Sequence, residues 1–299
     1  MIPLTLLYVP AARPDRFAKA AAAGADVVII DLEDAVSPSC KDEARRAMAE
    51  ALAGPAPSLA AGGARGGGRE GGAGGVAEGG AGRIQVRINA EGSPWFADDC
   101  AALADLDPAV EARIPKAESA EQVRRIAERL PGRRLHLLVE SAAGLEHAGE
   151  IAAAHDRVAS LALGESDLRS DLRTDSSRAM AWARMRVLVA ARAAGLPSPS
   201  MSVYPHVTDL EGLAADCREG AALGFVGRAA IHPRQLATIV EAFRPGEAEV
   251  ERARAVIAQV RDAQSRGSGV VVTADGAFLD AAMVSAAKAV LARAAAGGR

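Results

Sequence analysis

Acidic side chains close several apolar runs of this sequence, and carboxylates in that arrangement could bind a divalent metal ion. They follow VVII, LHLLV and VASLALG and are Asp31, Glu33, Asp34, Glu140, Glu165 and Asp167. Hard cations such as Mg²⁺ take oxygen ligands, often one or two carboxylates with water and substrate completing the coordination. Glu140 and Asp167 are the candidate ligands, because adjacent strands could bring them to one rim. Spacing alone leaves open an ion pair or helix-start charge for Glu140 and a helix cap for Asp167.

Arg87, in the run VRIN, is the candidate for binding an anionic group. A planar guanidinium suits a substrate carboxylate or a developing enolate oxygen, and it could also pair with the acidic rim. Lys116, which ends ARIPK, can be interpreted in the same way, and a Schiff-base role would require a desolvated amine. His232 in IHP could contact substrate at the rim, although a lone histidine is more often a structural hydrogen-bonding group.

Arg13 follows the first apolar run, with Arg16 and Lys19 about one and two helical turns further on. These cations could bind a phosphorylated ligand, or they could form an ordinary solvated face. The formal net charge of −3 provides no broad basic field, so nucleic acid is not an expected partner. The sequence instead favours a small-molecule ligand.

The elements that must position these side chains are eight apolar runs separated by Ala-, Arg- and Glu-rich helical stretches. The predicted strands cover residues 5–10, 25–34, 83–89, 110–116, 134–140, 157–164, 200–205 and 223–233. Eight strand-plus-helix units suit a (β/α)₈ TIM barrel over residues 1–245. An open doubly wound sheet is the alternative, and the absence of a GxGxxG after the first run weakens it.

Two segments stand outside this repeat. Residues 54–82 hold 13 of the 30 glycines and few large apolar side chains, which predicts a disordered insertion in the barrel. Residues 246–299 exceed what a barrel needs, with a helix expected over 246–267, a hairpin over 268–280 and a helix over 281–296. This C-terminal helical extension could act as a lid or an oligomerisation segment.

The composition indicates how large a core the chain can bury and in which cellular compartment it is expected. The sequence has 299 residues, of which 49% are hydrophobic, so it can bury a large core. The three cysteines lie far apart, which fits a reducing compartment rather than a disulfide framework. The N-terminal apolar run is short and ends at Pro10, so neither a signal peptide nor a membrane span is expected, and the cytoplasm is the expected location.

Eight motifs in order extend over nearly the whole chain outside the glycine-rich insertion. They are YVPAARPDRFAKA, GADVVIIDLEDAV followed by KDEAR, VRIN, IPKAES, LVESAAGL, LALGESDL, GFVGRAAIHPRQL and VVTADGAFLDAAM. This series resembles the citrate lyase β-subunit family, the CitE-like CoA-ester lyases grouped with the HpcH/HpaI aldolases. The resemblance implies a (β/α)₈ barrel that binds Mg²⁺ and assembles as a homotrimer or hexamer.

The resemblance also assigns roles to single residues. Glu140 and Asp167 match the metal ligands, and Glu140 would also contact substrate. Arg87 matches the substrate-binding and catalytic arginine. Asp280 in GAFLD matches an acid that comes from a neighbouring subunit, and it is the candidate proton-transfer group. The remaining expected substrate contacts are Tyr8, Arg13 and Lys19 at the CoA entrance, with Ser166 and His232 at the rim.

The expected activity is Mg²⁺-dependent cleavage of a 3-hydroxyacyl-CoA ester, of the malyl-, citramalyl- or citryl-CoA type, to an oxo acid and an acyl-CoA. Departures such as Gly227-Arg228, where the family more often has Gly-Lys, leave the metal pair intact but do not fix the substrate. Two alternatives remain open. One is a non-catalytic protein or lyase-complex subunit that binds CoA esters or oxaloacetate, and the other is a metal-dependent aldolase acting on free oxo acids.

Overall fold

The computed structural model describes residues 3–53, 83–265, 271–272 and 278–296, and its main element is a seven-stranded parallel sheet. The strand order is β6-β5-β4-β3-β2-β1-β7, so the first six strands lie in chain order and the last one pairs with the first. The strands are β1 (Thr5–Pro10), β2 (Val27–Asp31), β3 (Arg83–Arg87), β4 (Glu111–Ile114), β5 (Leu135–Val139), β6 (Val158–Leu163) and β7 (Arg228–Ala230).

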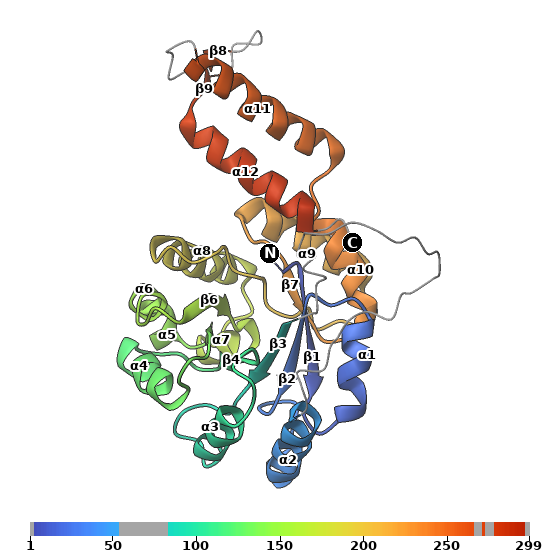
Figure 1. Ribbon diagram of the computed structural model, residues 1–299, viewed down its shortest axis with the longest axis vertical. Coiled ribbons are helices and arrows are strands. Elements are labelled where there is room, and N and C mark those ends of the chain that lie inside the picture. The colour runs from blue at the N-terminus through green and yellow to red at the C-terminus, as the bar shows by residue number, and fades with distance from the viewer. Residues whose placement is uncertain (1–2, 54–82, 266–270, 273–277, 297–299) are drawn as a thin grey trace, which may run out of the picture.

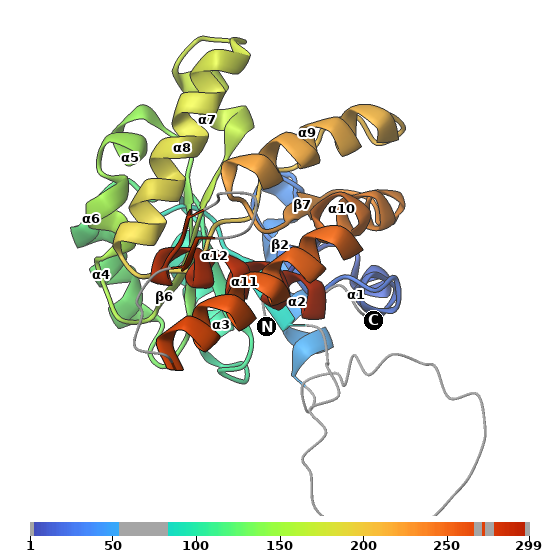
Figure 2. The ribbon, with the colours of Figure 1, turned by 90° about the horizontal axis from the view of Figure 1, so that it is seen from above.

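Helices connect the strands and cover the outer side of the curved sheet (Figures 1 and 2). The α-helices around the sheet are α1 (Phe17–Ala22), α2 (Lys41–Leu52), α3 (Phe96–Ala104), α4 (Ala120–Arg129), α5 (Ala142–Glu146), α6 (Ala148–Ala152), α7 (Glu165–Asp171), α8 (Ser177–Ala193), α9 (Leu210–Leu223) and α10 (Leu236–Phe243). Short 3₁₀ turns are η1 (Pro14–Arg16), η2 (Pro38–Cys40) and η3 (Pro233–Gln235). Parallel strands require such crossovers, because a hairpin turn can join only antiparallel neighbours.

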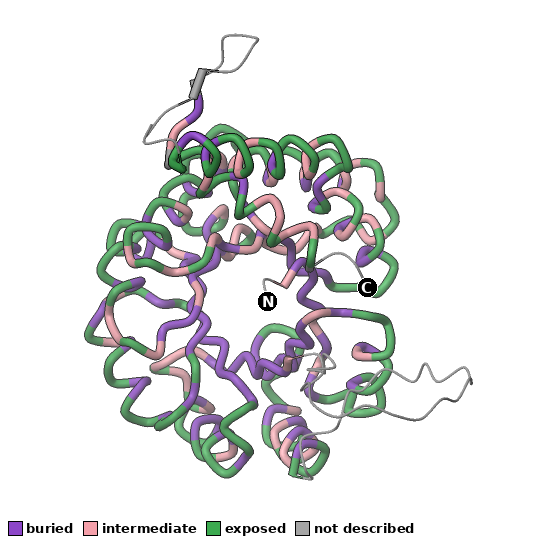
Figure 3. Tube along the Cα trace, turned by 45° about the horizontal axis from the view of Figure 1, so that its top comes forward, coloured by how far each residue is buried: buried purple, intermediate pink, exposed green. Residues whose placement is uncertain are grey.

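Alternation along the strands divides the buried residues into two groups. Leu7 and Val9 of β1 belong to the large core between sheet and helices, whereas Leu6 belongs to a small inner cluster with Val27, Ile29 and Ala229. The inner face of the middle strands is polar instead. There the His136 ring contacts the Glu111 carboxylate and the Ser160 hydroxyl, each at 2.8 Å. Figure 3 shows these buried strands enclosed by helices whose outer faces are exposed.

The predicted strand over 200–205 is wrong as a strand. In the structure Met201 makes a single parallel bridge to Arg228, the only β pairing of this stretch among the described residues. Prolines at 197, 199 and 205 explain this, because proline lacks the N–H that a ladder needs. The sheet therefore has seven strands rather than the eight expected. Between its two edges, the Ser202 hydroxyl accepts a hydrogen bond from the Glu165 N–H (3.3 Å).

The extension begins after α10 and contains α11 (Glu247–Ser265) and α12 (Ala281–Ala296), which pack against each other. Between them, β8 (Val271–Val272) pairs antiparallel with β9 (Phe278–Leu279), as the predicted hairpin requires. Both predicted helices are present. In Figure 1 this pair projects from the rest of the molecule, with β8 and β9 at its far tip. The predicted disordered insertion over 54–82 lies outside the described residues.

Candidate metal and substrate site

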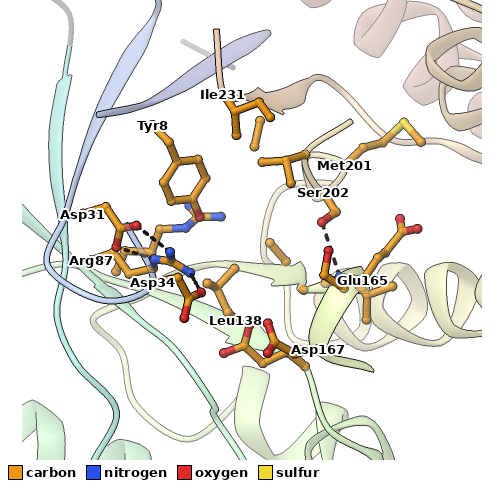
Figure 4. Close-up of a pocket in the computed structure, with 18 of the residues that line it drawn as sticks. Tyr8, Asp31, Asp34, Arg87, Leu138, Glu165, Asp167, Met201, Ser202 and Ile231 are labelled. Atoms are coloured by element: carbon orange, nitrogen blue, oxygen red, sulfur yellow. Dashed lines mark hydrogen bonds and ion pairs between the residues drawn. The ribbon is translucent and has the colours of Figure 1, made fainter. Parts of the chain in front are cut away.

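A cavity of about 310 Å³ lies at the carboxyl ends of the parallel strands. Its wall brings together five of the predicted site residues, namely Tyr8, Arg87, Glu140, Ser166 and Asp167. The rest of the wall is mainly small or apolar and includes Leu138, Ala162, Met201, Val203 and Ile231. Figure 4 shows Tyr8 and the Asp31–Arg87 pair on one side of this cavity and Asp167 on another.

Glu140 directly follows β5 and is only 4% exposed. One carboxylate oxygen, Oε1, accepts a hydrogen bond from the backbone N–H of Lys116 (2.8 Å). Burial raises the pKa of Glu140 to about 7, and the negative charge of Asp167 acts in the same direction. A buried carboxylate beside a second acid, with one oxygen not hydrogen-bonded within the described chain, is suited to bind a cation.

Asp167 lies in the first turn of α7, and its carboxylate makes no hydrogen bond or ion pair within the described chain. Gly164, the residue before this helix, has no side chain and so leaves room for the side chain of Glu140. A Cβ atom at position 164 would lie 2.7 Å from the Cβ of Glu140 and closer still to its carboxylate. The backbone at Gly164 is therefore packed closely against the Glu140 side chain.

This donor set fits Mg²⁺. Within the described ranges no three His, Cys, Asp or Glu side chains form a cluster that could hold a metal ion alone. Mg²⁺ does not need such a cluster, because it usually keeps several waters and takes one or two protein carboxylates together with substrate oxygens. Glu140 and Asp167 would be those two ligands, and the open cavity leaves room for the others.

Arg87 at the end of β3 is held by three acids of the β2 rim. Its Nε and Nη2 donate to the two oxygens of Asp31 (2.7 and 2.6 Å), and its Nη1 lies 2.9 Å from Glu33 and 3.1 Å from Asp34. The bidentate pair with Asp31 fixes the plane of the guanidinium. Nη1 is not bonded to Asp31, so it is the guanidinium nitrogen that can donate to substrate once the exposed Asp34 moves away.

Glu33 is buried beside Arg87, and after Glu140 it is the second acid of the site whose pKa is raised. Burial raises the pKa of Glu33 to about 8, against the opposing effect of the Arg87 charge. The carboxyl of Glu33 therefore keeps its proton to a higher pH than an ordinary glutamate does.

The structure does not bring every predicted site residue to the cavity. Arg13 forms an ion pair with Asp15 (2.9 Å) on the exposed β1–α1 connection, and the exposed Lys19 lies 3.9 Å from the same acid. His232 is exposed, and its Nδ1 accepts a hydrogen bond from the Arg234 N–H at the start of η3. Arg13 and Lys19 remain near the first strand's end, but none of these three lines the cavity.

Asp280 lies at the start of α12, in the extension. Its Oδ1 accepts hydrogen bonds from the N–H groups of Ala282 (2.9 Å) and Met283 (3.1 Å) and so caps this helix. It does not line the cavity of its own chain. Figure 1 places the β9–α12 junction at the tip of the projecting pair, and the arrowheads of β1 and β2 point away from that pair.

Sequence reasoning missed two features of the site. Lys116 acts through its backbone N–H, and its side chain is exposed and does not line the cavity. Arg113 was not singled out, although it is buried and does line the cavity. Its position two residues from Glu111 in a strand that faces a polar interior was the available signal.

The remaining acids of the sixth strand–helix junction are structural. Glu165 forms a hydrogen-bonded ion pair with Arg184 of α8 (2.8 Å), and Arg184 also binds Asp216 of α9 (3.0 Å). Asp171 accepts a hydrogen bond from the Ala142 N–H (2.6 Å). Of the three acids in ESDLRSD, Asp167 is thus the one left for a ligand.

Fold and site together define a class: an α/β protein with two neighbouring carboxylates, which are candidate metal ligands, and an arginine at the carboxyl ends of parallel strands. The family model described as HpcH/HpaI aldolase/citrate lyase matches residues 4–61 and 77–233. The chain therefore belongs to the HpcH/HpaI aldolase/citrate lyase family.

Several characterised proteins are similar over nearly their full lengths. Citrate lyase subunit beta of Leuconostoc mesenteroides subsp. cremoris is 32% identical, covering 96% of this chain and 91% of that protein. L-malyl-CoA/β-methylmalyl-CoA lyase of Cereibacter sphaeroides is 30% identical (95% and 92% covered), and (3S)-malyl-CoA thioesterase from the same species is 33% identical (97% and 94%). The crystal structure of CitE from Mycobacterium tuberculosis with magnesium, acetoacetate and coenzyme A aligns with a TM-score of 0.77 at 34% identity, covering 98% of both chains.

Proposed function

We propose that this protein is a Mg²⁺-dependent lyase that cleaves a carbon–carbon bond in a 3-hydroxyacyl-CoA ester. The observation that carries this proposal is the meeting of Glu140 and Asp167, both with free oxygens, in one cavity with Arg87. The relatives support the substrate class, because two of them are named for malyl-CoA and a similar structure holds magnesium and coenzyme A.

Glu140 and Asp167 would hold the Mg²⁺ ion, which when bound polarises the substrate oxygens and fixes their orientation. A base removes the proton of the 3-hydroxyl group. The bond between C2 and C3 then breaks, the hydroxyl carbon becomes the carbonyl of an oxo acid, and the electron pair passes to the thioester as an enolate. Arg87 Nη1 stabilises the negative charge on the enolate oxygen. Protonation at C2 gives the acyl-CoA.

The proton-transfer group is Asp280 of a neighbouring copy. The distance of the β9–α12 junction from the strand ends in Figure 1 supports a contribution in trans, and family resemblance points to the same residue. The protein is accordingly a homo-oligomer, a trimer or hexamer, in which the extension of one copy covers the cavity of the next. Arg13 and Lys19 sit on the outer rim, where they can receive the phosphates of CoA.

The sheet is the wall of a (β/α)₈ barrel that segment 200–205 closes. The Met201 bridge to β7 and the hydrogen bond from Glu165 to Ser202 support this closure, since they connect the segment to both sheet edges.

None of the described helices is long and apolar enough to cross a membrane.

One experiment tests the proposal against its alternatives. Malyl-, methylmalyl-, citramalyl- and citryl-CoA are incubated with the purified chain and Mg²⁺ or EDTA, and the products are identified by mass spectrometry. The expected result is an oxo acid and an acyl-CoA that appear only with Mg²⁺. A hydroxy acid with free CoA would identify a thioesterase, activity on free oxo acids without CoA would identify an aldolase, and binding without turnover would identify a binding protein or complex subunit.

A further inference from the structure

Arg113 is a buried arginine whose charge the described chain leaves without an ion-pair partner. It lies in β4 beside Arg87 of β3, is 4% exposed and lines the metal cavity. Its one hydrogen bond within the described residues is from Nη1 to the Gln85 side-chain oxygen (3.1 Å), and its Nε has no partner there. No carboxylate of the described chain lies within ion-pair distance of it.

The other buried arginines of the described chain differ from Arg113 in having a carboxylate or several main-chain carbonyls as partners. Arg87, Arg184 and Arg228 each have a carboxylate oxygen within 3.0 Å. Arg133 instead donates to the main-chain carbonyls of four residues, Ala104, Leu106, Asp107 and Val110. Burying a cation with no anion nearby is costly, so Arg113 has the environment of a group that awaits an anionic ligand.

The position of Tyr8 indicates from which side that ligand arrives. The guanidinium carbon of Arg113 lies 5.8 Å from the centre of the Tyr8 ring, and that of Arg87 lies 5.0 Å from it. Tyr8 lines the metal cavity, and Figure 4 shows its ring beside Arg87 there. The ring therefore contacts the guanidinium groups of two neighbouring strands, and all three side chains line this cavity.

Arg113 also borders a second cavity, of about 210 Å³, whose lining includes Arg83 and Arg134. Arg134 has an ion pair with Glu111 (3.4 Å) and Arg83 is partly exposed, so neither has the buried, unpaired charge of Arg113. The metal cavity is where a substrate carboxylate is already expected. We therefore place the anion of Arg113 there.

We propose that Arg113 determines specificity by binding a second carboxylate of the substrate, one that the metal ion does not hold. This inference rests on the proposed function and narrows it. The preferred thioester is one whose oxo-acid fragment is a dicarboxylate, rather than a fragment that ends in hydrogen or a methyl group. A planar guanidinium fits a carboxylate with two parallel hydrogen bonds, which an apolar group cannot accept.

Citryl-CoA and citramalyl-CoA form a matched pair of substrates, because they differ only in a carboxymethyl group that replaces a methyl group. The intact protein with Mg²⁺ is expected to have a kcat/KM roughly 10- to 100-fold higher for citryl-CoA, the size of a charge-assisted hydrogen bond. Arg113→Met, which keeps the length of the side chain but not its charge, is expected to lower kcat/KM for citryl-CoA by that factor relative to citramalyl-CoA, so that the preference disappears.

Arg83→Met is the control, since Arg83 borders only the second cavity and its loss should leave the ratio unchanged. Equal kcat/KM values for the two thioesters in the parent protein would overturn the inference even if Arg113→Met fails to fold. An equal change of the ratio in Arg83→Met would overturn it too, by placing the anion in the second cavity. Failure to cleave any of the four thioesters would overturn the proposed function itself, whereas cleavage of malyl-CoA or citramalyl-CoA with no preference for citryl-CoA would overturn only the role of Arg113.

Discussion

At the scale of single residues, the two candidate ligands are held by different means. Glu140 is fixed by the Lys116 N–H and by close packing on Gly164, whereas Asp167 is placed by the first turn of α7 and keeps both oxygens free of protein donors in the described chain. Because Glu140 is fixed and Asp167 can adjust, we expect an ion to bind without rearrangement of the buried side chains that line the cavity.

Gly164→Ala tests the fixed ligand. The added Cβ would overlap the Glu140 side chain, so we expect the Mg²⁺ affinity to fall at least about tenfold, with an overpacking cost of about 1–3 kcal/mol in the free energy of unfolding. Calorimetric titration with Mg²⁺ measures the affinity. Gly149→Ala is the matched control, because a Cβ at position 149 of α6 meets no atom within 4 Å. Unchanged Mg²⁺ binding in Gly164→Ala would contradict the placement of Glu140.

Glu33 gives the protein a pH-dependent stability. Because burial raises the pKa of Glu33 from 4.5 to about 8, the folded protein keeps a proton that the unfolded chain releases, and stability falls as pH rises through this range. Glu33→Gln removes the effect. We expect its free energy of unfolding to rise relative to the parent by up to about 1.4 kcal/mol per pH unit between pH 5 and pH 8. Urea unfolding in EDTA at several pH values checks this, and a difference that does not vary with pH would refute it.

The sequence could predict Glu140, Asp167 and Arg87 at the cavity because each closes or ends an apolar run, and a strand end has a defined place in a parallel sheet. For Arg113 the sequence offers only its position two residues from Glu111, because the fold decides which face of β4 turns inward and so whether Arg113 is buried. Nor could the sequence show that Arg13 and His232 have partners on the surface, since those contacts form within their own loops.

At the scale of elements, the β4–α4 connection carries strain that serves the site. Lys116 has a positive φ of 49°, a conformation that side-chain-bearing residues rarely adopt, and this conformation accompanies the hydrogen bond from its N–H to Glu140. The strain is thus located where the backbone, rather than a side chain, positions a candidate ligand.

Substitutions at Lys116 distinguish the role of its backbone N–H from the role of its side-chain amine. We expect Lys116→Ala to retain turnover, because the N–H remains and the exposed amine does not line the cavity. Lys116→Gly should be more stable than Lys116→Ala by about 1 kcal/mol, the reverse of the usual order, since glycine adopts positive φ freely. Thermal unfolding and steady-state kinetics measure both effects. Loss of turnover in Lys116→Ala would instead indicate a reacting amine.

The sequence predicted elements well where a periodic pattern of apolar residues extended over many residues. It predicted them poorly where prolines limited the pairing of a strand. The helix over 281–296 has the predicted bounds, and the helix over 246–267 is present as α11 at 247–265. The segment 200–205 has the apolar content of a strand, but its flanking prolines limit pairing to one bridge. The run 223–233 is shortened to β7, because Gly224 ends α9 in the left-handed conformation.

At the scale of the whole molecule, Asp280 and the metal cavity belong to different parts of one chain, and the proposed function requires that they meet between copies. A mixed oligomer tests this. Asp280→Ala and Glu140→Gln should each be nearly inactive alone. When the two variants are co-expressed with different tags and purified as a mixture, about a quarter of the sites should combine an intact cavity with an intact neighbouring Asp280. No recovery of activity in the mixed oligomer would exclude a contribution in trans.

The most direct test of the account is the Mg²⁺-dependent turnover of Glu140→Gln and Asp167→Asn with the thioester that the parent protein cleaves best. Both substitutions keep the side-chain volume and remove a negative charge from the ion. The account predicts that each variant stays folded, binds Mg²⁺ at least about tenfold more weakly and loses roughly a thousandfold or more in kcat/KM. Full Mg²⁺-dependent turnover in either variant would contradict the assignment of the metal site.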